Sequence, residues 1–94
     1  MKVLFTPSAQ GELVQVINHI ASENPAAAIK MRQRIADALR RLETFPQSGR
    51  IIPEFPTLDY REVIVRPYRF FYAVRDDTVW IVAVWHSAQL PNSP

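Results

Sequence analysis

Hydrophobic spacing in the first half of the chain predicts two helices. Apolar residues recur at intervals of three and four over residues 7–22, which is the period of an amphipathic helix. Asn24 followed by Pro25 is a cap-and-proline signal, and it predicts a second helix from there to about Thr44. Two or three residues join them, so we expect an antiparallel helical hairpin. The expected core stripes are Leu13, Val16, Ile17 and Ile20, then Ala28, Met31, Ile35, Leu39 (or Ala38) and Leu42.

The period changes to two in the second half of the chain. Three runs of β-branched and aromatic residues predict strands over Tyr60–Arg66, Tyr68–Arg75 and Val79–His86, and Lys2–Thr6 predicts a further short strand at the start. Three prolines and one glycine indicate that residues 45–59 form a loop without a helix or strand of its own. We expect apolar side chains to hold this loop on the domain: Phe45, Ile51, Ile52 and Phe55.

The order β-α-α-β-β-β predicts an α+β fold. The short connections favour an antiparallel meander, with the two-helix hairpin packed on one face of a mostly antiparallel sheet. A chain of 94 residues is expected to be a single domain over residues 1–94. Residues 87–94 hold two prolines and no apolar pattern, so we expect a flexible tail there.

Strand parity assigns the side chains to two faces of the sheet. Two-residue turns at Pro67-Tyr68 and Asp76-Asp77 would pair residue 66 with residue 69 and residue 75 with residue 78, and paired residues share a face. One face then carries Glu62, Ile64, Arg66, Arg69, Phe71, Ala73, Arg75, Trp80, Val82, Val84 and His86. The more apolar face, expected under the helices, carries Arg61, Val63, Val65, Tyr68, Phe70, Tyr72, Val74, Val79, Ile81, Ala83 and Trp85.

Arg66, Arg69 and His86 are the candidate site residues, because parity gathers them at one end of the first face, with Glu62 further along. One interpretation is a shallow cationic site for phosphate or acidic side chains, in which His86 titrates near neutral pH. The other is that all three are strand-end residues in water. Arg66 should face Arg69 across the turn, in water or beside an anionic partner. If that partner is a carboxylate of the target or the antitoxin, replacing Arg69 should weaken binding while hardly changing folding.

Composition excludes several chemistries. The chain has no cysteine, which rules out a disulfide framework, a thiol nucleophile and a Cys-type zinc site. It also lacks a glycine-rich phosphate loop, a His/Asp/Glu metal spacing and a nucleophile elbow, so no metal or cofactor is expected. The apolar start stops at Pro7, far short of a signal sequence or a membrane span, which favours a cytoplasmic protein.

The net charge of +2 is unevenly distributed. Residues 30–50 carry net +4 and residues 60–70 carry net +2, and all but one of these basic side chains are arginines. Such blocks are either the solvated face of a helix or, if they gather on one surface, a footprint for nucleic acid.

The chain resembles the RelE/ParE superfamily of bacterial toxins from type II toxin–antitoxin modules. The likeness rests on the element order and on four stretches: Asn24–Ala28, Phe45–Arg50, Arg61–Tyr72 and Val82–Gln89. It implies an antitoxin encoded next to this chain as a partner, and a toxin–antitoxin heterotetramer is one assembly that it allows. It also implies a role in plasmid stabilisation and growth inhibition.

The resemblance leaves open whether the protein is an enzyme. RelE-like members cut mRNA on the ribosome, but their strand lysines would fall at Glu62 and Ile64, and a further basic residue near Gln89. Arg69 alone matches a catalytic arginine; if the chain is a ribonuclease, its catalytic residues would be Arg69, His86 and Arg66. Otherwise these residues bind the target, and the pattern is ParE-like, with DNA gyrase as the family's usual target. An inactive module that only binds an antitoxin is the third alternative.

Overall fold

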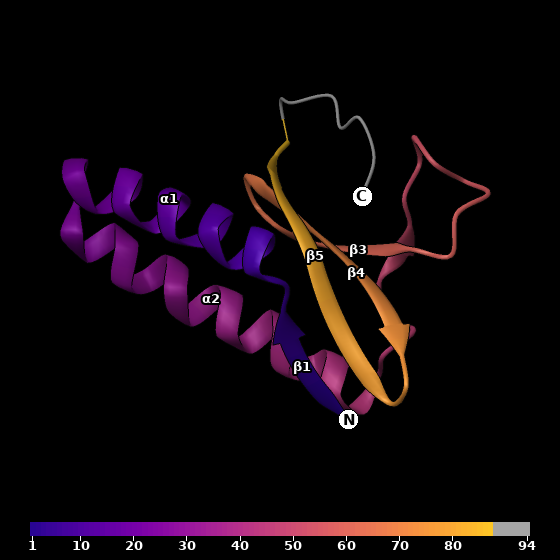
Figure 1. The fold of residues 1–94 in the computed structure, drawn as a ribbon. Helices are drawn as coiled ribbons and strands as arrows, with labels where there is room; N and C mark the ends of the chain where they lie inside the picture. Colours follow the sequence, from indigo (N-terminus) through magenta and orange to yellow (C-terminus); the bar gives the residue numbers. More distant parts are fainter. Residues whose placement is uncertain (88–94) are drawn as a thin grey trace.

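Two helices lie on one face of a five-stranded mixed sheet in the computed structural model, which describes residues 1–87 (Figure 1). The predicted α+β order is confirmed, with one short strand added. The predicted tail lies outside the described residues apart from Ser87. The elements are β1 (Lys2–Phe5), α1 (Pro7–Glu23), α2 (Pro25–Thr44), β2 (Arg50–Ile51), β3 (Arg61–Val65), β4 (Tyr68–Arg75) and β5 (Thr78–His86).

The strands follow the order β1-β5-β4-β3-β2. The β3-β4-β5 meander is antiparallel, whereas β1 pairs parallel with β5. The helical hairpin connects β1 at one edge of the sheet to β2 at the other edge, and the meander then leads back to β1. The loop predicted to lack an element contains β2, whose two residues pair with the start of β3. Beyond the end of β1, the Val84 N–H on β5 donates to Glu12 of α1 at 3.0 Å, so α1 continues the cover of that edge.

Both helices begin as the sequence predicts. The Thr6 hydroxyl accepts a hydrogen bond from the Ala9 N–H (3.2 Å), and the Asn24 side chain accepts one from the Ala27 N–H (3.1 Å). Each cap is followed by proline at the first helical position, where no N–H is needed. Among residues 1–87, no helix is long and apolar enough to cross a membrane.

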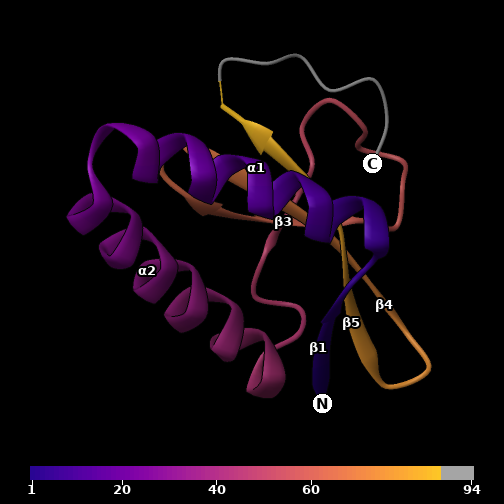
Figure 2. The ribbon, with the colours of Figure 1, turned by 60° about the vertical axis from the view of Figure 1, so that its left-hand side comes forward.

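The main core lies between the helices and the sheet. Figure 2 shows these layers, with α1 crossing in front of the sheet. The predicted α2 stripe is buried throughout, and the α1 stripe packs against the same core. From the sheet, the core receives Val63, Val65, Tyr68, Phe70, Tyr72, Val74, Val79, Ile81 and Val84. All of these except Val84 were assigned to this face by parity.

The turn between β3 and β4 lies one residue earlier than predicted. It is formed by Arg66 and Pro67, so Val65 pairs with Tyr68 and Ile64 pairs with Arg69. This moves the pairing by two residues, which leaves each side chain on its predicted face. The expectation that Arg66 faces Arg69 across the hairpin is therefore wrong, because Arg66 belongs to the turn.

A β-bulge overturns the assignment of the last four residues of β5. The register shifts between Phe71 and Tyr72, so that Phe71 pairs with Ala83 while Tyr72 pairs with Ile81. The extra residue flips every later side chain to the other face. Ala83 and Trp85 consequently face away from the helices, while Val84 and His86 lie on the helix side.

The loop after β2 covers part of the sheet face that points away from the helices, hereafter the open face. Ile52 is fully buried there against Phe71 and Ala83, and Phe55 packs on this second cluster. These two positions were predicted to hold the loop. Phe45 and Ile51 were predicted to do so as well, but they are 60% and 42% exposed.

Candidate functional site

Arg69 lies on the open face near the start of the middle strand, β4, between Ile64 on β3 and Trp85 on β5. Its guanidinium stands 5.1 Å from the centre of the Phe71 ring, which lies two residues along the same strand. Only 6% of the residue is exposed. The expectation that Arg69 stands in water is therefore wrong, and the inference that replacing it would hardly change folding loses its premise.

Two carboxylates neutralise this buried arginine. Its Nε donates to Glu62 Oε1 at 2.6 Å, while Nη1 and Nη2 donate to the two oxygens of Glu54 at 2.8 and 2.7 Å. These hydrogen bonds from Arg69 lower the pKa of Glu54 from 4.5 to about 2, and the two carboxylates raise the pKa of Arg69. Arg69 is thus an anchor that ties the loop bearing Glu54 to the sheet.

Glu62 is shared between two arginines. It is fully buried on β3, and its second oxygen accepts a hydrogen bond from Arg50 Nε on β2 at 2.6 Å. A buried carboxylate is tolerable when it is paired and hydrogen-bonded on both oxygens, as it is here. The outer end of Arg50 remains in solvent, since 56% of its side chain is exposed.

A small cavity of about 240 Å³ lies beside this cluster at the edge of the open face. We call it the rim pocket. Arg66 reaches it from the β3–β4 turn, and Ser87 reaches it from the end of β5. Its other lining residues are Arg50, Pro53, Glu54, Ile64 and Arg69.

The structure brings together two of the three predicted site residues. Arg66 and Arg69 both line the rim pocket, although only Arg66 is exposed. His86 is not beside Arg69. It lies on the helix side of the sheet, where its ring meets that of Tyr68 edge to face at 5.5 Å. The β-bulge thus puts His86 and Arg69 on opposite faces of the sheet, so within residues 1–87 the two do not form an acid–base pair.

Sequence reasoning missed Glu54 as a site residue. Glu62 was placed on the face of Arg69 by parity, but Glu54 lies in the loop, where no periodicity predicts direction. Its one local signal is position, because this carboxylate lies two residues after the buried Ile52 in a loop rich in proline. Among residues 1–87, no three His, Cys, Asp or Glu side chains cluster as they would around a metal ion.

The loop before β2 is held by Tyr72, which explains the glycine of the Phe45–Arg50 stretch. The Tyr72 hydroxyl accepts a hydrogen bond from the Gly49 N–H (2.9 Å) and donates one to the Pro46 carbonyl (2.8 Å). Burial raises the pKa of this phenol. A Cβ at Gly49 would stand 2.5 Å from the Tyr72 Oη and 2.7 Å from the Glu62 carbonyl oxygen, so no side chain fits.

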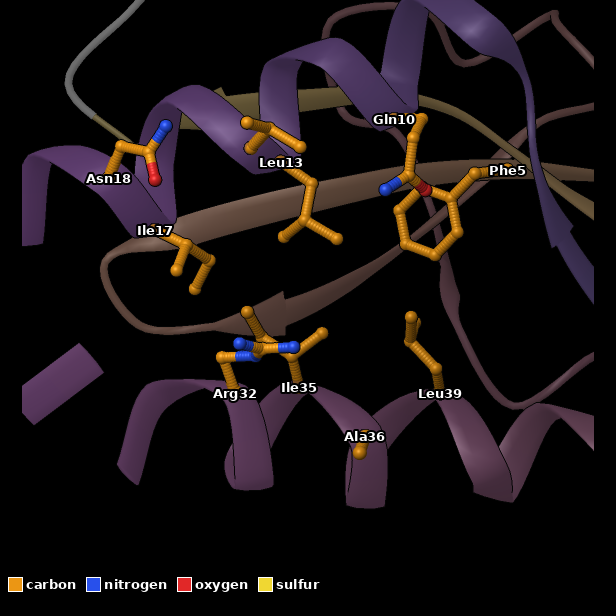
Figure 3. Close-up of a pocket in the computed structure, with 10 residues that line it drawn as sticks. Phe5, Gln10, Leu13, Ile17, Asn18, Arg32, Ile35, Ala36 and Leu39 are labelled. Carbon is orange, nitrogen blue, oxygen red and sulfur yellow. The ribbon is translucent and has the colours of Figure 1, made fainter. Parts of the chain in front are cut away.

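Grooves also run along the helices. The groove between α1 and α2 has a volume of about 430 Å³. Figure 3 shows Leu13 and Ile17 of α1 directed toward Ile35 and Leu39 of α2, with Arg32 on the α2 side. A second cavity of about 540 Å³ lies between the helical hairpin and the β3–β4 turn, and a third of about 290 Å³ lies between α2 and β3. Lys30 and Arg34 line the second cavity, and Arg41 and Arg50 line the third.

Residues 3–91 match the family described as the ParE toxin of the type II toxin-antitoxin system parDE. The chain belongs to the ParE toxin family. The resemblance to RelE/ParE toxins is thereby confirmed on its ParE branch. No curated protein sequence matches this ParE family member.

A solved structure described as the chromosomal ParDE TA system from P. aeruginosa has the same fold. Its TM-score to this structure is 0.75, and the likeness covers 92% of this chain and 95% of that chain. The two sequences are 20% identical, so this likeness bears on the fold alone.

Proposed function

We propose that this ParE family toxin arrests growth in the cytoplasm by binding DNA gyrase, without cutting RNA. The main support for this proposal is the burial and the hydrogen bonding of Arg69. It is the residue that matches a RelE-like catalytic arginine, yet 6% of it is exposed and all three of its side-chain nitrogens donate to Glu54 and Glu62. The two carboxylates neutralise its charge and use three of its five N–H groups, and its burial leaves little surface from which it could stabilise a phosphorane in a transition state.

The residues around Arg69 point in the same direction. Metal-free RNA cleavage needs a base for the 2′-hydroxyl and an acid for the leaving oxygen. Glu62 occupies a position where RelE-like members carry lysine, and its carboxylate is buried and paired with arginines. His86 lies on the opposite face of the sheet. These contacts favour a toxin that acts through its surface over a ribonuclease.

We also propose that the antitoxin is the product of the neighbouring gene and binds the grooves beside α2. Lys30 and Arg34 line one of these grooves, and Arg41 and Arg50 line the next. An extended acidic segment would meet cations from α2 and, at Arg50, from β2 along this path. Co-expression followed by size-exclusion chromatography with light scattering tests the complex, and its mass distinguishes a heterotetramer from a 1:1 pair. A toxin that stays monomeric and ignores the neighbouring product in a pull-down would contradict this part of the proposal.

The target is tested with the full chain purified from that complex. Gyrase supercoiling of relaxed plasmid should stop as toxin is added, and adding antitoxin back should restore it. Primer extension on mRNA from arrested cells should find intact transcripts. Codon-specific cuts with normal supercoiling would instead establish the ribosome-dependent nuclease. Antitoxin binding without any growth arrest would establish an inactive module.

A further inference from the structure

The rim pocket holds more positive charge than its own carboxylates neutralise. Glu54 lines the pocket and Glu62 pairs with two of its lining arginines, whereas the arginines of the lining are three: Arg50, Arg66 and Arg69. Arg69 donates every side-chain nitrogen to the two carboxylates. Arg50 donates only its Nε, and its two terminal nitrogens have no protein partner among residues 1–87. The exposed side chain of Arg66 has no ion-pair or hydrogen-bond partner within the same range.

These two arginines are presented from fixed elements. The pairing of β2 with β3 and the contact with buried Glu62 position Arg50. Arg66 stands in the tight β3–β4 turn, which is tied to the end of β5 because the Ser87 N–H donates to the Pro67 carbonyl at 2.7 Å. Donors held in this way lose less conformational freedom on binding than donors on mobile loops.

The chemistry of the lining selects the ligand. Three guanidinium groups and two carboxylates leave one net positive charge, which suits a single negative charge. Arginine forks match a carboxylate in two parallel hydrogen bonds. Ile64, 42% exposed, supplies apolar surface for the methylene stem of an acidic side chain. Glu54 on the same wall would repel the successive phosphates of a nucleic acid strand.

We propose that the rim pocket binds one aspartate or glutamate side chain of the protein that the toxin acts on. This rests on the proposed function, because it names the part of the toxin surface that engages the target. It places target recognition on the open face of the sheet, whereas the groove between α2 and β3 shares only Arg50 and Ile64 with this pocket. Arg66 and the outer end of Arg50 bind the carboxylate directly, while Arg69 and Glu62 hold Arg50 and the loop in place.

The first experiment tests the pocket without any assumption about the target. The probe is the capped peptide Ala-Leu-Glu-Leu-Ala, with Ala-Leu-Gln-Leu-Ala as its matched control, titrated into the labelled full chain and followed by NMR. The glutamate peptide should shift the Ser87 amide and the Arg50 and Arg66 Nε signals saturably, in the millimolar range, and the glutamine peptide should not. Arg66→Gln should remove the effect, whereas Arg40→Gln, on the exposed face of α2, should retain it. Equal shifts from both peptides, no shifts at the pocket, or shifts from an oligothymidylate instead would overturn the proposal.

The second experiment asks whether the pocket serves the target. Arg66→Gln should weaken inhibition of supercoiling at least tenfold, while its affinity for the antitoxin and its melting temperature stay near those of Arg40→Gln. Arg66→Lys, which keeps the charge but not the fork, should fall between. If wild-type toxin inhibits gyrase and Arg66→Gln does so equally well, the proposal fails while the proposed function stands. If wild-type toxin leaves gyrase unaffected, the proposed function fails, and loss of growth arrest in Arg66→Gln alone would still support the pocket.

Discussion

Replacing Arg69 by alanine should destabilise the fold of this ParE toxin. The Arg69 side chain is 7% exposed, and its guanidinium pairs with both Glu54 and Glu62. Its removal leaves the fully buried Glu62 with Arg50 as its remaining partner, and it releases the loop that Glu54 holds on the open face. Both effects act on folding before they act on any partner.

The magnitude follows from the burial of each partner. Removing one member of a buried ion pair costs about 3–5 kcal/mol, because a charge stays buried without compensation. Glu62 keeps Arg50 and the Glu54 side chain is 34% exposed, so it can turn to water. We therefore expect the lower end, about 3 kcal/mol. For a domain of this size that lowers the melting temperature by about 12–24 °C.

Thermal and urea unfolding monitored by circular dichroism measure this loss. Arg40→Ala is the matched control, since its ion pair with Asp37 is exposed on α2 and should contribute less than about 1 kcal/mol. Adding Glu62→Gln to Arg69→Ala should recover part of the stability, because the buried charge is then gone. A melting temperature for Arg69→Ala within about 4 °C of wild type, equivalent to less than about 1 kcal/mol, would refute the reasoning. If Arg69→Ala is too unstable to purify, Arg69→Lys carries the comparison.

Other perturbations probe the loops and the acid response. Gly49→Ala should lower the free energy of unfolding in urea by about 1–3 kcal/mol, since its Cβ would meet Tyr72 and a backbone oxygen. Gly11→Ala, in open space on α1, should raise it by about 0.5–1 kcal/mol, and equal effects of the two variants would contradict this account. Tyr72→Phe should lose about 1–3 kcal/mol, because the buried Gly49 N–H loses its acceptor; an unchanged urea midpoint would count against it. Glu54 has a depressed pKa when folded, so its contribution is present above about pH 4.5 and is lost as the pH falls to about 2. Glu54→Gln should therefore be less stable than wild type at pH 7 and should lose less stability across that window, and parallel pH curves would exclude this role.

The candidate site shows where inference from sequence stopped. Parity placed Arg69 and Glu62 on one face, and this holds because moving the turn by one residue moves the pairing by two, which preserves parity. His86 was placed there too, and the bulge moved it away, since one extra residue in β5 inverts every position beyond it. Nothing in the alternation of that strand marks the bulge. The carboxylate of Glu54 comes from a loop, and a loop has no period from which its direction can be read.

Local patterns determined the elements of this protein and the faces they bury, except for β2 and the last four residues of β5. The caps at Thr6 and Asn24, the stripe along α2 and the alternation through β3 and β4 each act over a few residues, so the sequence displays them directly. The tertiary structure decided what joins distant segments. The pairing of β1 beside β5, the bulge opposite Phe71 and the burial of Arg69 between Glu54 and Glu62 depend on contacts across many residues. From the sequence alone, an arginine in a strand is predicted to be exposed. Its burial requires carboxylate partners, and these come from segments distant in the chain that only the tertiary structure brings together.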